Sequence, residues 1–206
     1  MSNEFGYIGT AKPTQAVLSN SGVFSVNEHK ELIEDEKILS FGQLELIQTQ
    51  TISSGATMAF TSIKEIEYDV HFMTGNNLLT TNANTGIIIR LSSDGGSSYA
   101  AGTTYEKAGQ YGGTIANGES VSTGTSGLPF TSDTANQTKV ANTYLYDLGD
   151  STKYSFQNFH SQENNYYFWG IGCHDTASSI NAIQLTTNNG NDWTGTVALY
   201  GLKAYK

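Results

Sequence analysis

From residue 42 onward, apolar and polar residues alternate with a period of two, the spacing that sends successive side chains to opposite faces of a β-strand. The alternation is clearest over residues 64–74, where it predicts a half-buried antiparallel strand. The apolar side chains predicted to face the core are Ile66, Tyr68, Val70 and Phe72. The polar side chains predicted to face solvent are Glu65, Glu67, Asp69 and His71.

Similar patterns, separated by turn signals, predict further strands at 43–50, 56–63, 86–93, 142–148, 153–160, 165–173, 179–187 and 195–205. Residues 86–91 and 166–171 are apolar on both faces, so we expect central strands that are covered on both sides. Eight or nine strands of this kind favour two packed sheets. The predicted fold class is all-β, an antiparallel β-sandwich of jelly-roll-like type.

The start of the chain lacks this alternation. Residues 1–25 are predicted to be an extended polar segment, and residues 26–39 carry the densest charge in the chain. Ser25 followed by Glu28 resembles a capping box, which predicts one short helix over 26–39; a solvated charged loop is the alternative. We therefore predict an N-terminal extended arm with a short helix at 1–40, acting as an assembly anchor, and a β-sandwich domain at 41–206.

Residues 100–141 are rich in Gly, Ser, Thr, Asn and Ala and contain few large apolar residues. We predict one or two long loops here, on the rim of the sandwich together with a loop at 74–85. Loop 100–141 could bind a ligand or pack against a neighbouring subunit, and the sequence favours neither.

Charge and cysteine content narrow the classes of partner. The net charge is -9, and Arg90 is the only arginine among ten basic residues, which are scattered along the chain. A nucleic-acid or anionic-membrane partner is therefore not expected. No apolar run reaches membrane-spanning length and the first residues do not resemble a signal peptide, so we expect no membrane insertion. Cys173 is the only cysteine, which excludes an internal disulfide and fits assembly in a reducing cytoplasm.

Two short segments, 92–99 and 186–193, resemble the Asp-box hairpin of sialidases. The physical content of this motif is a turn, in which a side-chain oxygen accepts backbone amides and glycines supply positive φ. The predicted structural turn residues are Asp94, Gly95, Gly96, Asn188 and Gly190. Sialidase activity is not expected, because it would need several arginines for the substrate carboxylate and the chain has one.

No catalytic constellation is evident. The carboxylates at 65, 67 and 69 are expected on the solvent-exposed face of a strand. The four histidines lack the spacing of metal ligands. Cys173 and His174 are adjacent, so a strand would point them to opposite faces, and Cys173 is predicted to be a small core residue. We predict a non-enzymatic protein without catalytic residue, metal or cofactor.

The chain is rich in tyrosine, with 12, and has two tryptophans. Aromatic side chains at a surface can stack on sugar rings or anchor a protein interface. The candidates for interface or glycan contacts are Tyr105, Tyr111 and Trp193.

Several segments are similar to a group of proteins from tailed phages of marine bacteria. The shared segments are 22–26 before the charged stretch, the strand at 66–72, residues 89–99, residues 154–157 and the closing segment 195–203. Members of this group are taken to be virion components built as β-sandwiches, such as tail-fibre, tail-tip or head-surface proteins. The group carries no catalytic motif, so the resemblance implies no catalytic residue here.

This resemblance implies a phage virion structural protein, in a tail fibre or adsorption apparatus, that is assembled in the host cytoplasm. The implied partners are copies of itself, as a trimer, other virion proteins and, as a further candidate, a host-surface glycan. The alternatives are a capsid decoration or cement protein and a carbohydrate-binding module. The enzyme class that remains for comparison is a depolymerase or esterase.

Overall fold

The computed structural model describes residues 30–31, 44–114, 116–133 and 137–202. The chain divides into two compact units, Met1–Phe41 and Gly42–Lys206. The predicted arm and the predicted helix at 26–39 lie outside the described residues, apart from Lys30 and Glu31. The fold is therefore that of the second unit. Among the described residues, no helix has the length and apolar character needed to cross a membrane.

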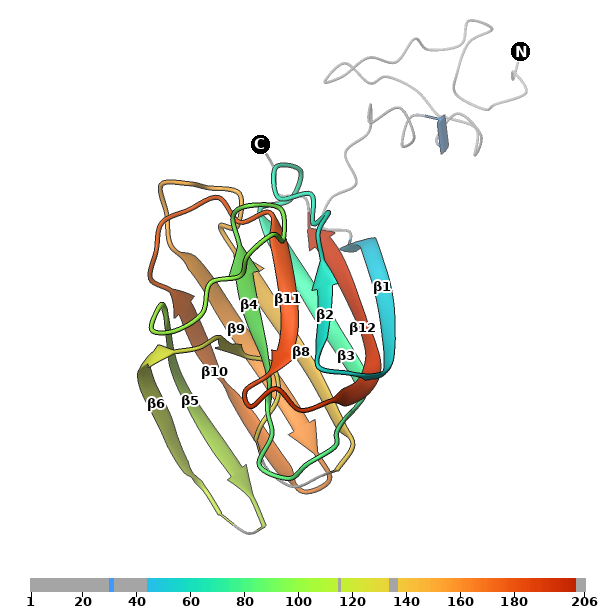
Figure 1. Ribbon diagram of the computed structural model, residues 1–206, viewed down its shortest axis with the longest axis vertical. Coiled ribbons are helices and arrows are strands. Elements are labelled where there is room, and N and C mark those ends of the chain that lie inside the picture. The colour runs from blue at the N-terminus through green and yellow to red at the C-terminus, as the bar shows by residue number, and fades with distance from the viewer. Residues whose placement is uncertain (1–29, 32–43, 115, 134–136, 203–206) are drawn as a thin grey trace, which may run out of the picture. The chain divides into compact units, whose positions relative to one another are not determined.

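Twelve strands make up the described part of this unit, more than the eight or nine predicted (Figure 1). Their bounds are β1 (Leu44–Gly55), β2 (Thr57–Phe60), β3 (Val70–Thr80), β4 (Ile87–Ser92), β5 (Tyr105–Gly113), β6 (Gly118–Thr125), β7 (Leu128–Pro129), β8 (Lys139–Tyr146), β9 (Ser155–Glu163), β10 (Tyr166–His174), β11 (Ala182–Thr187) and β12 (Trp193–Leu202).

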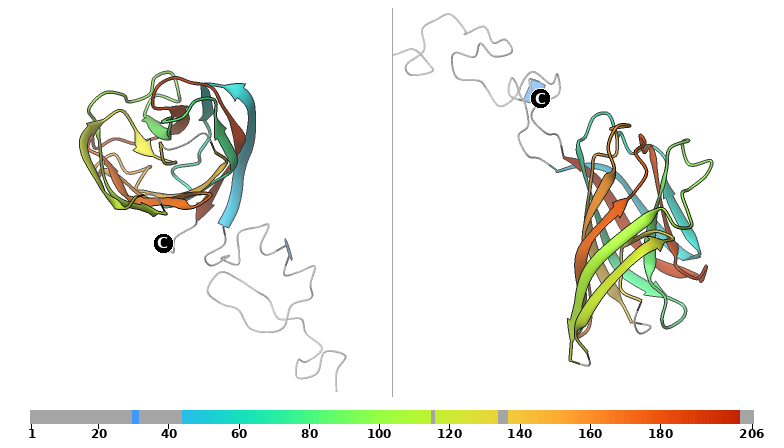
Figure 2. Two further views of the ribbon diagram at one scale, coloured as in Figure 1. Left: turned by 90° about the horizontal axis from the view of Figure 1, so that it is seen from below. Right: turned by 90° about the vertical axis from the view of Figure 1, so that its left-hand side faces the viewer.

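The strands form two antiparallel sheets that face each other as layers (Figure 2). The eight-stranded sheet has the order β1-β12-β3-β8-β9-β10-β5-β6, and the four-stranded sheet has the order β2-β11-β4-β7. Every observed pairing is antiparallel, which confirms the predicted all-β sandwich. We call the side of the eight-stranded sheet that faces the smaller sheet its inner face, and the opposite side its outer face.

The core lies between the two inner faces, and period-two burial generates it. In β12, each alternate residue from Trp193 onward is buried, and β9 alternates between buried and exposed over its whole length. Large side chains from both sheets meet there, including Trp193, Leu199, Ile89 and Phe60. Removing this apolar surface from water is the main source of stability for such a fold.

The predicted strand at 64–74 is wrong in both its start and its inward face. Lys64 adopts a positive φ of 58°, and the amide of Glu67 donates to its carbonyl at 3.0 Å, so a turn occupies the first positions. Ile66 is consequently 82% exposed. The strand begins only at Val70, and within it His71 and Met73 face the core instead of Val70 and Phe72.

Burial of His71 is made tolerable by a hydrogen bond, because its Nε2 donates to the carbonyl of Ile63 at 2.8 Å. Burial lowers the pKa of His71, which favours the neutral ring. Tyr68, just before the strand, is buried as predicted, and its hydroxyl donates to Glu45 at 2.7 Å. The alternation therefore predicted the burial of Tyr68 correctly. It did not predict the turn that precedes the strand, and the residues of the strand that face the core are consequently the opposite set from the predicted one.

The predicted loops at 100–141 are also wrong, because β5, β6, β7 and the start of β8 lie in this segment. Glycine and small polar residues hide these strands from a hydrophobic pattern. Gly109, for example, lies opposite Gly170 of β10, where a side chain on either residue would collide with the neighbouring backbone. The predicted loop at 74–85 is shorter than expected, since β3 continues to Thr80.

Both predicted central strands have neighbours on each side. β4 lies between β11 and β7, and β10 lies between β9 and β5. The expectation that β10 is covered on both faces is wrong, however. Its outward residues Tyr167, Trp169 and Ile171 are exposed.

Candidate functional site

The Asp94 turn follows β4 and is held by the hydrogen bonds that its sequence predicts. The amide and hydroxyl of Ser98 donate to the Asp94 carboxylate at 2.9 and 2.6 Å, and the Ser92 hydroxyl donates at 2.7 Å. These bonds lower the pKa of Asp94 to about 2. Gly95 and Gly96 have φ values of 74° and 89°, which explains why glycine occupies both positions.

The second turn also plays a structural part. Asn188 accepts the amide of Gly86 at 3.3 Å through its side-chain oxygen, and Gly190 has a φ of 77°. This turn joins β11 to β12, and its contact with Gly86 ties it to the start of β4. The carboxylate and amide oxygens of both turns are therefore used to hold backbone amides of this chain.

Two of the three predicted contact residues cannot touch a partner in this structure. Tyr105 and Trp193 are both 0% exposed, because each occupies an inward position of its strand. The Tyr105 hydroxyl accepts the amide of Leu91 at 2.8 Å and donates to the carbonyl of Ala100 at 3.1 Å, and burial raises the pKa of Tyr105 to about 12. Tyr111 is partly exposed and lies beside a surface hollow.

The adjacent Cys173 and His174 lie on opposite faces of β10, as the strand geometry predicts. His174 points inward and its ring packs on Tyr105, with centroids 4.9 Å apart. Cys173 is only partly buried and points outward, so its predicted place in the core is wrong. Partial burial raises the pKa of the Cys173 thiol. Among the described residues, no three His, Cys, Asp or Glu side chains form a metal-binding group.

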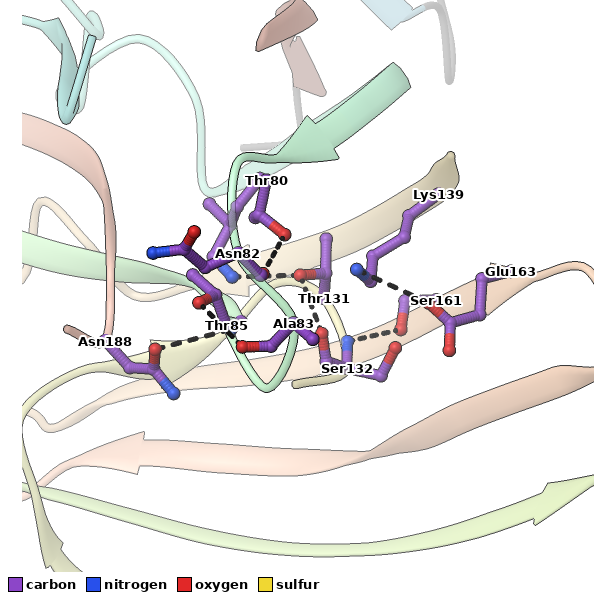
Figure 3. Close-up of polar contacts among 12 residues, drawn as sticks. Thr80, Asn82, Ala83, Thr85, Thr131, Ser132, Lys139, Ser161, Glu163 and Asn188 are labelled. Atoms are coloured by element: carbon purple, nitrogen blue, oxygen red, sulfur yellow. Dashed lines mark hydrogen bonds and ion pairs between the residues drawn. The ribbon is translucent and has the colours of Figure 1, made fainter. Parts of the chain in front are cut away.

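A polar cluster is buried at one end of the sandwich, between the strand ends and the segments at 81–86 and 131–133 (Figure 3). Lys139 of β8 and Glu163 of β9 form an ion pair of 3.4 Å with side chains only 1% and 4% exposed. Nearby, the amide of Ser132 donates to Ser161 at 3.1 Å, and the Thr131 hydroxyl accepts the amide of Ile87 at 2.9 Å. Desolvation raises the pKa of Glu163, and Lys139 opposes the shift.

The outer face of the eight-stranded sheet carries a row of aromatic side chains that contact one another. Phe72 of β3 lies between Tyr144 of β8 and Tyr200 of β12, with ring centroids 4.5 and 6.2 Å away. Tyr144 also neighbours Tyr146 at 6.4 Å. Phe156 of β9 is exposed and pairs with Tyr146 across the two strands. These contacts order side chains that face solvent, so the surface is preformed.

A hollow of about 600 Å³ lies farther along this face, over β10, β5 and β6. Figure 1 shows these strands at the side of the sheet away from β1. The residues that line the hollow are Gln110, Tyr111, Gly112, Gly113, Asn117, Gly118, Glu119, Tyr167 and Trp169. We call it the β10–β5–β6 hollow. Exposed aromatic rings surrounded by amides and one carboxylate give it both apolar and hydrogen-bonding surface.

The prediction from sequence missed Tyr167 and Trp169. They stand in an unbroken aromatic run, 166–169, that conceals which residues face outward. The usable signal comes just after this run, where Gly170 and Gly172 alternate with Trp169 and Ile171. Gly172 leaves space for Leu128 on the inner face, so the large residues must occupy the other side.

No protein-family model and no curated protein sequence matches the chain. Among solved structures, similarity is found to the NanB sialidase of Streptococcus pneumoniae, with 8% identity and a TM-score of 0.34 over 79% of this chain. The similar region spans only 27% of that sialidase chain. A marine PL-14 alginate lyase from Aplysia kurodai matches 67% of this chain and 71% of its own, with 7% identity and a TM-score of 0.35. A human SPRY domain matches 69% of this chain and 94% of its own, with 10% identity and a TM-score of 0.27.

Proposed function

We propose that this chain is a structural protein of a phage virion, a component of the tail fibre or adsorption apparatus that acts by binding. The segments that resemble marine phage proteins support the virion assignment. The observation that carries a binding role is the outer face, where Phe72, Tyr144 and Tyr200 are ordered by mutual contact yet remain on the surface. Ordered exposed aromatics lose little side-chain entropy when a partner covers them.

The partners proposed are copies of the same chain, in a trimer, and other virion proteins. Sedimentation equilibrium of the purified full chain tests the trimer directly, and a monomer at micromolar concentration would contradict it. The outer face offers the apolar surface that such contacts need, whereas the inner face is already occupied by the four-stranded sheet.

Electron microscopy of phage particles labelled with antibodies against this chain tests the location. We expect label at the tail, together with binding of the purified full chain to host cells. Label distributed over the head at lattice positions would favour the alternative, a capsid decoration or cement protein. Particles without any label would contradict a virion role altogether.

A carbohydrate-binding module is the second candidate, and it is compatible with adsorption to a host-surface glycan. The specific observation in its favour is the β10–β5–β6 hollow, where Tyr167 and Trp169 are exposed beside amide side chains. The competing enzyme class predicts release of reducing ends or acetate from host polysaccharide by the purified chain. We expect neither product.

A further inference from the structure

The β10–β5–β6 hollow has an aromatic floor of defined geometry. Tyr167 and Trp169 are two residues apart on β10, so both point to the outer face, where they remain 44% and 38% exposed. Their ring centroids are 5.4 Å apart and their planes differ by 31°. Two large rings that are held side by side at the surface form a platform on which a ligand can stack.

A glycine in the neighbouring strand gives the Tyr167 ring its position. Gly112 pairs with Tyr167 across β10 and β5, and a Cβ on Gly112 would lie 2.9 Å from the ring carbon Cε2. The ring therefore lies against the backbone of β5. A larger residue at position 112 would push the ring away and disturb the platform.

Polar side chains stand next to the platform in the same register. Gln110 pairs with Trp169, and Glu119 of β6 pairs with Gln110, so all three project from the outer face. Asn117 lies in the turn between β5 and β6 and also lines the hollow. Together these side chains offer amide donors, amide acceptors and one carboxylate acceptor.

The charge of the lining limits which ligand can bind. Among the described residues that line the hollow, Glu119 is the only charged one. The nearest lysine in β5, Lys107, belongs to the inner face, where its ammonium lies 5.9 Å from the centre of the Phe168 ring. An anionic ligand would meet the Glu119 carboxylate, and no lysine or arginine stands among the described lining residues, which is unfavourable for its binding.

We propose that the β10–β5–β6 hollow is a binding site for an uncharged oligosaccharide. The C–H faces of sugar rings stack on Tyr167 and Trp169, and the hydroxyls exchange hydrogen bonds with Gln110, Asn117 and Glu119. This inference deepens the proposed adsorption role, on which it rests for its biological meaning. In this proposal the oligosaccharide binds at the β6 side of the outer face, and the row formed by Phe72, Tyr144 and Tyr200 makes the protein contacts.

Calorimetric titration of the purified full chain tests the ligand class. The probes are hexasaccharides of α-1,4-linked glucose, β-1,4-linked glucose and β-1,4-linked mannose, with the hexamer of galacturonic acid as the anionic counterpart. We expect at least one neutral probe to bind with a dissociation constant below about 1 mM, and the galacturonate hexamer to bind at least about tenfold more weakly. Failure of all three neutral probes, or equal binding of the anionic one, would overturn the proposal.

Substitutions test the location. Trp169→Ala should weaken binding of the neutral probe at least about tenfold, because it removes half of the platform. Ile171→Ala is the matched control, since this exposed residue lies on the same face of β10 but does not line the hollow; its affinity should stay within about twofold of wild type. Equal affinity of Trp169→Ala and wild type would show that the sugar binds elsewhere.

Tryptophan fluorescence gives an independent readout, because the chain has only two tryptophans and Trp193 is 0% exposed. Acrylamide quenching of the full chain should therefore report mainly on Trp169, and the bound neutral probe should reduce it. Unchanged quenching at a saturating concentration of sugar would contradict stacking on Trp169. A negative result with sugars leaves the antibody-labelling result for particles unaffected, so failure of this site and failure of the virion assignment are distinguishable.

Discussion

The two faces of the eight-stranded sheet contain side chains of similar size in opposite surroundings. On the inner face, Trp193 and Leu199 are packed against the smaller sheet and have no exposed surface. On the outer face, Phe72, Tyr144 and Trp169 contact neighbouring rings but remain at the surface. A large side chain therefore contributes to stability in one setting and is available for binding in the other.

The two tryptophans offer the sharpest test of this difference. Trp193→Ala should lower the free energy of unfolding by about 3–5 kcal/mol, since it opens a cavity in the core. Trp169→Ala should lower it by less than about 1 kcal/mol, because its ring is already partly in water. Urea unfolding of both variants measures the contrast. Similar losses for the two would mean that the outer face is part of the core.

Ion pairs extend the comparison to charged residues. Glu163→Ala should cost about 3–5 kcal/mol, because it leaves the ammonium of Lys139 in a buried environment without this carboxylate. The matched control is Lys153→Met, which removes the exposed pairs with Asp147 and Asp150. We expect no measurable change in the unfolding midpoint of the control. Recovery of stability in the double variant Lys139→Met, Glu163→Leu would confirm that the loss comes from the buried charge.

Replacing a glycine by alanine should also cost more stability on the inner face than on the outer face, but the difference should be smaller than for the tryptophans and the ion pairs. A Cβ on Gly201 would collide with the ring of Tyr68, which is buried and has little room to move. Gly201→Ala should therefore destabilise by about 1–3 kcal/mol. The control is Gly112→Ala, which meets the exposed ring of Tyr167, and its cost should be below about 1 kcal/mol. Gly112→Ala should instead weaken binding of the neutral hexasaccharide.

The strands that could be predicted from the sequence are those whose inner and outer residues differ in polarity. β12 is an example, because Val197 and Leu199 face the core whereas Thr194 and Thr196 lie on the other face. β5 and β6 could not be predicted, because Gly, Ser and Thr occupy most of β6, and Tyr105 and Tyr111 are the only large apolar residues of β5. Their place in the sheet depends on pairing with β10, a contact between distant segments that no local pattern contains.

The candidate site was predicted less well than the fold, for a related reason. Tyr105 and Trp193 were singled out as contact residues, yet residue type alone does not distinguish an inward aromatic from an outward one. Tyr111 is among the residues that line the hollow, but it pairs with the inward Phe168, so its ring lies on the other face from Tyr167 and Trp169. The main residues of the platform, Tyr167 and Trp169, lie opposite the inward glycines Gly170 and Gly172, and the hollow beside them depends on pairing of β10 with β5 and of β5 with β6.

Substitution of Asp94 should have the smallest effect on stability, since its turn lies outside both faces of the sheet and Asp94 is exposed. Hydrogen bonds from Ser98 and Ser92 lower the pKa of Asp94 from its ordinary 3.8 to about 2, so the carboxylate contributes stability above pH 3.8 that is lost as the pH falls through about 2. Asp94→Asn should therefore melt at a lower temperature than wild type at pH 7, and the difference should shrink toward pH 2. Ser98→Ala, which removes one donor to this carboxylate, should raise the pKa of Asp94 in an NMR titration. An unchanged pKa of Asp94 in that variant would show that the Ser98 hydroxyl does not stabilise the ionised carboxylate.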